Sequence, residues 1–530
     1  MPSTPKMWRP PLPDFLNHAF DSFLTAQPRP GLKPIPGTKP LTPEAILCPV
    51  LLYYIALLLL PPPPPSSIAS PQVVLLRNIL AASAAFLFLR LPVAYHVPQS
   101  IGLTYQLGLV GLYGGLRVLD AFFVSLYLWG HVPRRVRYQH RLRPETPSAG
   151  GDVDASLKPW SDGGDNGMLK KPNPPTPKDK NYGRRPSLAR GISQSDLLDN
   201  MTSQSYTALL SADDSYTTML SKLLDGPHPI PVTETAHTED DYPHTFLDRM
   251  SWALELELSM RGVGFTWTTA DVRHTKKTWL PSVRNRVHSI LVHVGPVIVV
   301  AWAVIKAVYV NRLQGLEGKG VESPFDELGL GEQYALTAAL GAFLMAAFSL
   351  GHSIFAIVCS PLAPSPLAFF PPLYTTRVWD ITSARGFWSY GWHRLFARLF
   401  LVWGVWPGEW VERKLLGKTA DQRADVGKVL GVFLSSALVH SFAVRGTLGG
   451  TWADAAGEAK FFAWNGFAVV LEEVVKRVVR RWRRQSGAKE TMWYDAYIGR
   501  IWWIGLLLTT GRNFARGWTK AGLVREMALM

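Results

Sequence analysis

The chain has 530 residues, of which 47% are hydrophobic and only 18% are charged. A soluble globular protein carries roughly 25% charged residues, so this composition favours a protein embedded in lipid. The formal net charge is +15, but many arginines gather beside apolar segments. Such flanking charge follows the positive-inside bias of membrane proteins. We therefore expect membrane lipids as partners and no nucleic acid.

The two cysteines, Cys48 and Cys359, lie in separate apolar segments. They lack the paired spacing of a zinc site or a redox motif, so we expect no bound metal. The N-terminus contains prolines and Asp14 before any apolar run, unlike a cleavable signal peptide. Insertion is therefore expected to start at the first internal apolar segment.

Long apolar segments recur along the chain and predict an all-α, polytopic membrane bundle. About eight or nine transmembrane or re-entrant helices are expected, at 45–60, 79–93, 101–129, 288–310, 334–359, 387–406, 426–444, 461–479 and 498–510. A further helix from Phe246 is amphipathic and is expected to lie at the membrane interface. Within the third segment, Arg117 and Asp120 are three residues apart and are expected to pair on one helix face.

Changes in composition divide the chain into four predicted regions. Residues 1–44 form a cytosolic or interfacial segment, and 45–130 form the N-terminal transmembrane helices. Residues 131–245 are rich in Pro, Gly, Ser, Asp and Lys and predict a long disordered polar loop. Residues 246–530 contain most of the apolar segments and are expected to form the core.

The arginine clusters before 288 and after 479 are expected on the same side of the membrane. Five candidate helices separate them, so one should fail to cross. The arginine-rich segment 387–406 is the natural re-entrant candidate, because irregular backbone at membrane depth is tolerated where it lines a cavity. This interpretation predicts a cavity beside His393.

Two histidines at membrane depth are the leading candidates for chemistry. His440 ends a run of apolar residues interrupted only by Ser435 and Ser436. An ionisable residue in such a place is costly and indicates function by default, and a neutral imidazole can act as a general base. The alternative is a histidine that only bonds a neighbouring helix. His393 follows a stretch of aromatics and glycines, which an interfacial aromatic belt would explain only in part.

These two sites together carry a resemblance to a known family. The block Phe387-Trp388-Ser389-Tyr390-Gly391-Trp392-His393 precedes, by about fifty residues, the helix that ends at His440. The pair resembles the signature of the wax-synthase-like branch of the membrane-bound O-acyltransferases, and the segment that starts at Arg261, Gly262 and Gly264 resembles a block of its fungal members. Glu472 matches an acidic residue in the helix after the distal histidine.

The resemblance implies that residues 246–530 form an acyltransferase core that uses acyl-CoA as a co-substrate and holds no permanent cofactor. By this analogy His440 is the catalytic base, and His393, with Trp392, positions the thioester. The resemblance further suggests a substrate-binding set of Trp388, Trp392, Ser436, Arg385 and Arg394. Arg261, Gly262, Gly264, Phe387 and Glu472 are expected to be structural members of the family motifs.

The acceptor is expected to be an apolar, hydroxylated small molecule. The fungal resemblance favours acetyl transfer to a terpenoid or other secondary metabolite, and an integral protein of the endoplasmic reticulum. A wax ester synthase for long-chain alcohols is the alternative within the family. A transporter, a lipid-binding protein or an inactive scaffold is the alternative without chemistry. The internal repeats typical of many transporters are not apparent, and this favours an enzyme.

Overall fold

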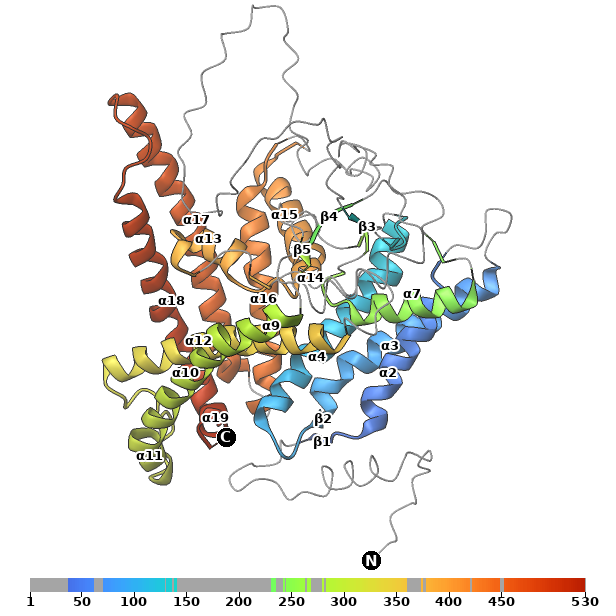
Figure 1. The fold of residues 1–530 in the computed structure, drawn as a ribbon, viewed down its shortest axis with the longest axis horizontal. Coiled ribbons are helices and arrows are strands. Elements are labelled where there is room, and N and C mark those ends of the chain that lie inside the picture. The colour runs from blue at the N-terminus through green and yellow to red at the C-terminus, as the bar shows by residue number, and fades with distance from the viewer. Residues whose placement is uncertain are drawn as a thin grey trace, which may run out of the picture.

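A computed structural model gives the fold, which is predominantly helical (Figure 1). It describes residues 37–61, 70–128, 130–135, 138–140, 230–234, 242–243, 245–262, 265–267, 279–280, 283–359, 373–374, 378–419, 422–448 and 452–529. Most of the two predicted segments 1–44 and 131–245 lies outside these residues, and the four region boundaries therefore stay predictions.

Three helices build the N-terminal part, and polar caps set where they start. Helix α2 (Pro43–Leu58) begins after Thr42 and α3 (Pro71–Ala94) after Ser70, each with a capping side-chain oxygen and a proline at the first position. Both features favour a helix start, because the cap satisfies a free N–H and proline needs none. Helix α4 (Ile101–Leu119) continues as the π-helical η1 (Asp120–Leu128).

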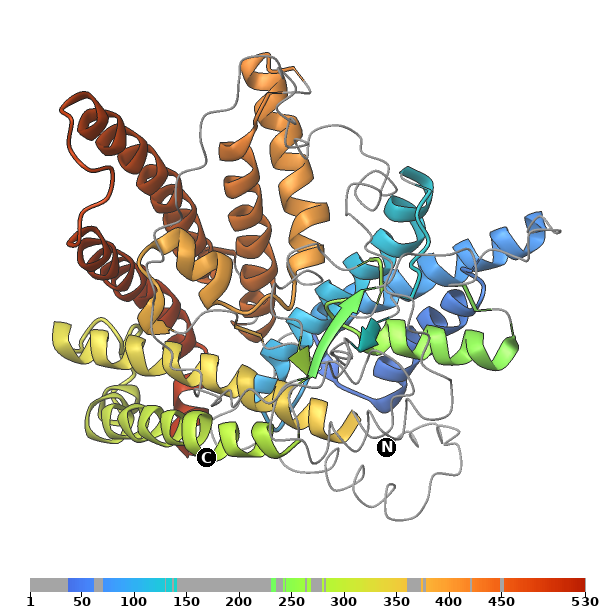
Figure 2. The same ribbon diagram turned by 45° about the horizontal axis from the view of Figure 1, so that its top comes forward.

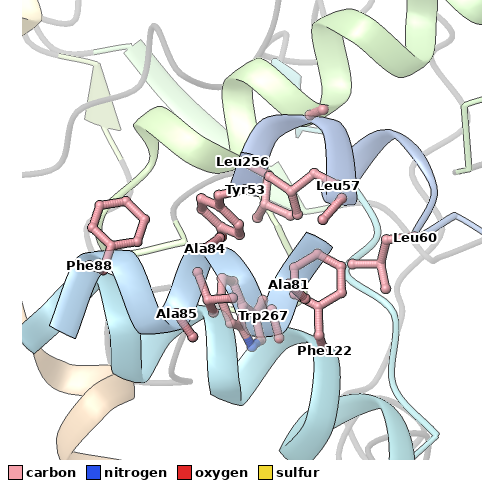
Figure 3. Packing of buried hydrophobic residues seen from close by; sticks show 14 of the residues in the cluster. Tyr53, Leu57, Leu60, Ala81, Ala84, Ala85, Phe88, Phe122, Leu256 and Trp267 are labelled. Carbon is pink, nitrogen blue, oxygen red and sulfur yellow. The ribbon is translucent and has the colours of Figure 1, made fainter. Parts of the chain in front are cut away.

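The core of this part lies where α2, α3, η1 and the amphipathic helix α7 (Phe246–Leu258) meet. Figure 3 shows Tyr53 and Leu57 on one side and Ala81, Ala84 and Phe122 on the other. The small alanines of α3 let neighbouring helices approach closely, as is common between membrane helices. Helix α7 was expected from Phe246, and its existence is confirmed.

Short strands connect the helices. Strand β1 (Lys39–Pro40) pairs in parallel with β2 (Tyr95–His96), which joins the start of α2 to the end of α3. A second sheet is antiparallel, with the order β3-β4-β5, and consists of Tyr138–His140, Ile230–Glu234 and Trp279–Leu280. The hydropathy pattern did not predict these strands.

The middle of the chain forms two long helical rods. The first is a run of α9 (Val283–Ser289), η3 (Ile290–Val294), α10 (Gly295–Val308), η4 (Tyr309–Leu313) and α11 (Gln314–Gly318). The second is α12 (Leu330–Cys359), and Figures 1 and 2 show α10 and α12 side by side. Both rods expose apolar side chains, such as Val299 and Val300 on the first and Ile354 and Val358 on the second, as a lipid-facing surface would.

The C-terminal helices pack against one another and against α4. They are α16 (Asp425–Leu448), α17 (Trp452–Gln485), α18 (Asp495–Lys520) and α19 (Leu523–Leu529), drawn from orange to red in Figure 1. Five helices in the described part are long and apolar enough to cross a membrane, and α2 is a shorter apolar helix. The expected helical membrane bundle is therefore confirmed.

The predicted helix 387–406 is broken into short pieces. They are α13 (Ala384–Gly386), η7 (Phe387–Gly391), α14 (Ala397–Phe400), η8 (Leu401–Val405) and α15 (Trp406–Leu416). The break falls directly after η7, where Trp392 has an extended backbone. Irregular backbone beside His393 is thus present, as predicted for a re-entrant segment. The proline-rich stretch 361–372 that precedes it is not among the described residues.

Glycines bring the last two of these pieces, η8 and α15, against α16. A Cβ added to Gly404 or Gly408 would collide with the backbone of Gly431 or Gly427, and the reverse substitutions would collide as well. In each of the two segments the glycines are four residues apart, a spacing of small residues that allows helix backbones to touch. The contact fixes α16, and with it His440, relative to the chain that follows His393.

The expected pair of Arg117 with Asp120 is wrong. Asp120 instead accepts hydrogen bonds from Arg398 at 2.8 and 3.1 Å and from the Ser125 hydroxyl at 2.6 Å. Arg117 donates to the carbonyl oxygens of Leu256 and Ser259 at the end of α7. The last carbonyls of a helix have no partner within the helix, so they compete successfully for the guanidinium.

Asp120 offers a stability test, because its side chain is only 3% exposed. Asp120→Ala should lower the free energy of unfolding by about 3–5 kcal/mol, since it leaves the Arg398 charge buried without its carboxylate. Thermal unfolding in detergent would measure the loss. Asp326→Ala is the matched control, because its ion pair with Arg516 is 42% exposed on both sides and should be worth about 0–1 kcal/mol. Equal shifts for both variants would contradict this interpretation.

Candidate active site

His440 lies on α16 and faces three other helices. Its imidazole stacks on Phe462 of α17, with ring centres 4.8 Å apart, and meets Phe514 of α18 edge-on at 5.9 Å. On its other side Nδ1 lies 2.8 Å from the hydroxyl of Tyr105 on α4. Aromatic rings therefore hold the plane of the imidazole, and one ring nitrogen already has a polar partner.

A buried carboxylate belongs to the same polar cluster. Glu458 Oε2 lies 3.5 Å from His440 Nδ1 and 3.4 Å from the Tyr105 hydroxyl. Its other oxygen accepts a hydrogen bond from the Trp518 indole N–H at 3.0 Å. These four side chains come from α4, α16, α17 and α18, so the cluster forms only when the helices are assembled.

His393 lies in the chain break after η7. Its ring packs against Phe348 at 4.6 Å and Trp392 at 5.0 Å, and Phe396 meets it edge-on. Its Nδ1 atom is buried and has no hydrogen-bond partner among the residues that the structure describes. A buried polar atom without a partner is rare in folded proteins and calls for an explanation such as a ligand.

The fold brings the two histidines into one region. A continuous series of ring contacts connects them: His393 contacts Trp392, which contacts Trp388, which contacts Phe462, the ring that stacks on His440. The Trp388 indole N–H donates to Asn465 Oδ1 at 3.1 Å. The sequence predicts that His393 and His440 converge, and a structure with the two histidines on opposite membrane faces would have ended the active-site hypothesis. The chain of ring contacts between them is not such an arrangement.

The predicted structural residues of the block hold it against the C-terminal helices. Ser383 caps α13 through Gly386 N–H at 2.9 Å, and Glu472 of α17 accepts from Ala384 N–H at 2.7 Å. Phe387 stacks on Trp503 of α18, with ring centres 5.2 Å apart. Glu472 and Phe387 therefore lie in supporting positions, the first on the backbone of α13 and the second on a ring of α18.

The other expected site residues lie at varying distances from this centre. Ser436 is buried on α16, one turn before His440. Arg385 is 60% exposed and pairs with Glu473 at 2.8 Å. Arg394 donates to the Ser389 carbonyl and lies over the Tyr390 ring. Their proposed contacts with substrate stay predictions.

The predicted motif around Arg261 is described only in part. Arg261 is buried, and one of its guanidinium nitrogens lies 3.2 Å from His352 Nε2. Gly262 has a positive φ of 69°, a conformation that favours glycine. Gly264 is outside the described residues. A small cavity beside Arg261 is lined by Arg117, Met260 and Arg398 among others, and neither catalytic candidate reaches it.

Sequence reasoning missed Tyr105, Glu458, Asn465 and Trp518. A signal for two of them was present: Glu458, Asn465 and Glu472 are seven residues apart on α17, and all three are buried. Polar residues at this spacing share one helix face.

In the described part of the chain, no group of three or more His, Cys, Asp or Glu side chains could hold a metal ion.

Long apolar helices around two half-buried histidines and a buried glutamate define a helical integral membrane protein with a polar centre. Comparison with known proteins gives a family resemblance. Residues 370–464, which include His393, His440 and Glu458, match the model of the "Membrane bound O-acyl transferase family". Over this segment the chain is similar to the membrane-bound O-acyltransferases.

The chain is also similar to a curated protein. "O-Mevalon transferase yanI" of Aspergillus niger (strain ATCC 1015) is 25% identical over 309 residues, which cover 54% of this chain and 64% of the relative. The match thus spans less than two thirds of the relative's length. No solved structure matches the chain. These matches give neither the donor nor the acceptor of this chain.

Proposed function

We propose that the protein transfers an acetyl group from acetyl-CoA to a hydroxyl of an apolar acceptor, a terpenoid or related secondary metabolite, in the endoplasmic reticulum membrane. The observation that carries this proposal is His440, a half-buried imidazole packed among aromatic rings whose Nδ1 lies 2.8 Å from the Tyr105 hydroxyl. The other nitrogen, Nε2, is therefore the one available to a substrate. Acyl-CoA is the co-substrate, and no permanent cofactor takes part.

The chemistry follows from the two imidazoles. His440 Nε2 takes the proton of the acceptor hydroxyl, and the oxygen attacks the thioester carbon. The carbon–sulfur bond then breaks, and the CoA sulfur leaves with the proton that His440 gives back. Negative charge on the carbonyl oxygen needs a donor aimed at it. His393 Nδ1, which is buried and has no partner among the described residues, is suited to that task.

Substrate positioning falls to the aromatic and basic residues of the block. Trp388 and Trp392 provide apolar faces beside His393, and Ser436 adds a hydroxyl on the helix of His440. Arg385 is exposed and can bind phosphate groups of CoA, whereas Arg394 is bonded to the backbone of the block. Membrane lipids surround the bundle and deliver the apolar acceptor.

Two alternative functions would give a different result in an assay for acetyl esters. A wax ester synthase would use long acyl chains and long-chain alcohols, and a transporter or lipid-binding protein would form no ester. The name of the Aspergillus relative describes transfer of a mevalon group to oxygen. A mevalonyl thioester therefore belongs among the donors to be tested.

The test is expression in yeast, followed by incubation of microsomes with a panel of substrates. The donors are acetyl-, octanoyl-, palmitoyl- and mevalonyl-CoA, and the acceptors are farnesol, a steroid alcohol and 1-hexadecanol. Mass spectrometry should detect an acetyl ester of a terpenoid or steroid alcohol that is absent from microsomes of the empty vector. Esters of 1-hexadecanol with palmitate would support the wax synthase instead. Absence of every ester from correctly folded protein would contradict the proposal.

A further inference from the structure

Glu458 is a buried carboxylate, and burial of a charged group is energetically unfavourable. It lies on α17, is 1% exposed and is surrounded by side chains from α4, α16 and α18. A charged group in such surroundings loses several kcal/mol of hydration unless it is bonded. Two donors compensate it here, the Trp518 indole at 3.0 Å and the Tyr105 hydroxyl at 3.4 Å, and His440 Nδ1 lies 3.5 Å away.

The carboxylate favours one tautomer of His440. Glu458 can only accept, and the Tyr105 hydroxyl satisfies it by donating to Oε2 at 3.4 Å. In that arrangement the Tyr105 oxygen accepts from His440, so Nδ1, at 2.8 Å, carries the hydrogen. Nε2 is left with its lone pair, which is the form that a general base requires.

The same carboxylate lies close to the charge that forms during the reaction. When His440 takes a proton on Nε2 it becomes an imidazolium, and Glu458 Oε2 is 3.5 Å from its Nδ1. Opposite charges attract strongly where little water screens them. The proton on Nδ1 stays there throughout, and Glu458 gains no proton. The carboxylate acts by orientation and by charge.

We infer that Glu458 is a positioning residue for His440, acting directly and through Tyr105, and that it selects the reactive tautomer and stabilises the imidazolium. The inference rests on the proposed function, because it presumes that His440 is the base. It deepens that function by adding a carboxylate and a phenol to the two histidines. A carboxylate that orients a histidine base has the same role in hydrolytic triads.

A purely structural role is the competing explanation, because Glu458 joins four helices. The two roles differ in what a substitution changes. If Glu458 only stabilises the bundle, Glu458→Gln lowers the amount of folded protein and leaves turnover per folded molecule unchanged. If it positions His440, the folded amount is largely kept and kcat falls. The Michaelis constant for acyl-CoA then changes little, because the lost interaction is made mainly in the transition state.

The experiment uses the full-length protein in detergent and the acyl-CoA and alcohol pair that gives most ester with the wild type. Glu458→Gln should lower kcat by about 100-fold, less than the loss in hydrolytic triads because Tyr105 mediates the contact. KM for the acyl-CoA should stay within about threefold of the wild-type value. Glu458→Asp restores the charge and should recover part of kcat. Tyr105→Phe removes only the hydroxyl and should lower kcat by about 10-fold.

Glu409→Gln is the matched control. Glu409 on α15 is also buried and charged, but its partners are Arg413 and Lys428 rather than a histidine. Its kcat per folded molecule should equal that of the wild type. Size-exclusion chromatography gives the folded amount of every variant.

The inference is overturned if Glu458→Gln and Tyr105→Phe both keep wild-type kcat per folded molecule. It is also overturned if Glu458→Asp recovers no more activity than Glu458→Gln. Should Glu458→Gln not fold, Tyr105→Phe and Glu458→Asp decide the matter alone. His440→Ala in the same assay separates this result from the proposed function: an active His440→Ala refutes the function, whereas an inactive one with an active Glu458→Gln refutes only the role of Glu458.

Discussion

His440→Ala should abolish ester formation, with a fall in kcat of about 1000-fold or more, because removal of a general base costs about 100- to 10,000-fold. The imidazole is the group in the described site whose position, ring packing and polar partner all suit proton transfer from an alcohol. Truncation leaves Tyr105 and Glu458 bonded to each other. The helices should therefore still assemble, and acyl-CoA should still bind.

The measurement is ester yield by mass spectrometry, divided by the folded amount of protein. His96→Ala provides the control, because His96 is a buried histidine on β2 whose Nδ1 contacts the Thr38 hydroxyl at 2.7 Å, away from the site. This variant should lose some stability and keep its turnover per folded molecule. If His440→Ala retained turnover close to that of the wild type, the assignment of the base would be wrong.

The second large effect is expected at the glycine contact between α15 and α16. Gly408→Ala adds one methyl group where the backbone of Gly427 already lies, so the helices must separate or shift. Overpacking of this kind costs about 1–3 kcal/mol. The shift would also move α16 and thereby His440, so both the melting temperature in detergent and the activity should fall.

Gly505→Ala on α18 is the matched substitution, because nothing lies within 4 Å of the added Cβ. Alanine is the better helix former by roughly 1 kcal/mol, so this variant should be as stable as the wild type or more stable. A melting temperature that is unchanged in Gly408→Ala would show that the two helices do not touch along these glycines.

Some helices of the bundle follow from hydropathy to within a few residues, whereas α17 starts nine residues before its predicted span and α18 ends ten residues after its own. The segment expected at 426–444 is α16 (Asp425–Leu448), and the segment expected at 101–129 is the continuous pair of α4 and η1. Apolar runs bounded by polar caps determine such elements locally. The short strands are not local in this sense, because β1 pairs with residues more than fifty positions away. Pairing at that distance leaves no pattern in a single strand of two residues.

The site was also only partly predictable, because local patterns reveal some of its residues and long-range contacts determine the others. His393 and His440 are conspicuous because they are ionisable residues among apolar ones. Glu458 precedes the predicted span 461–479 and resembles an ordinary flanking charge until α17 is seen to start at Trp452. Tyr105 reaches His440 across 335 residues, a contact that no spacing in the sequence indicates.

The failed pairing of Arg117 with Asp120 illustrates the limit of local reasoning. A spacing of three on one helix predicted the pair, but Arg398, 278 residues away, binds both oxygens of the aspartate. Two hydrogen bonds from a planar guanidinium are stronger than one contact along a helix surface. Tertiary structure therefore decided the partners of both residues.

The claim at the centre of this account is that His393 and His440 face one thioester from two sides. Cryo-electron microscopy of the full-length protein with a non-hydrolysable acetyl-CoA analogue tests it most directly. The acetyl carbonyl should lie between the two imidazoles, with its oxygen within hydrogen-bonding distance of His393 and an open approach to its carbon from His440 Nε2. An analogue bound with its acetyl group away from both rings would contradict the claim.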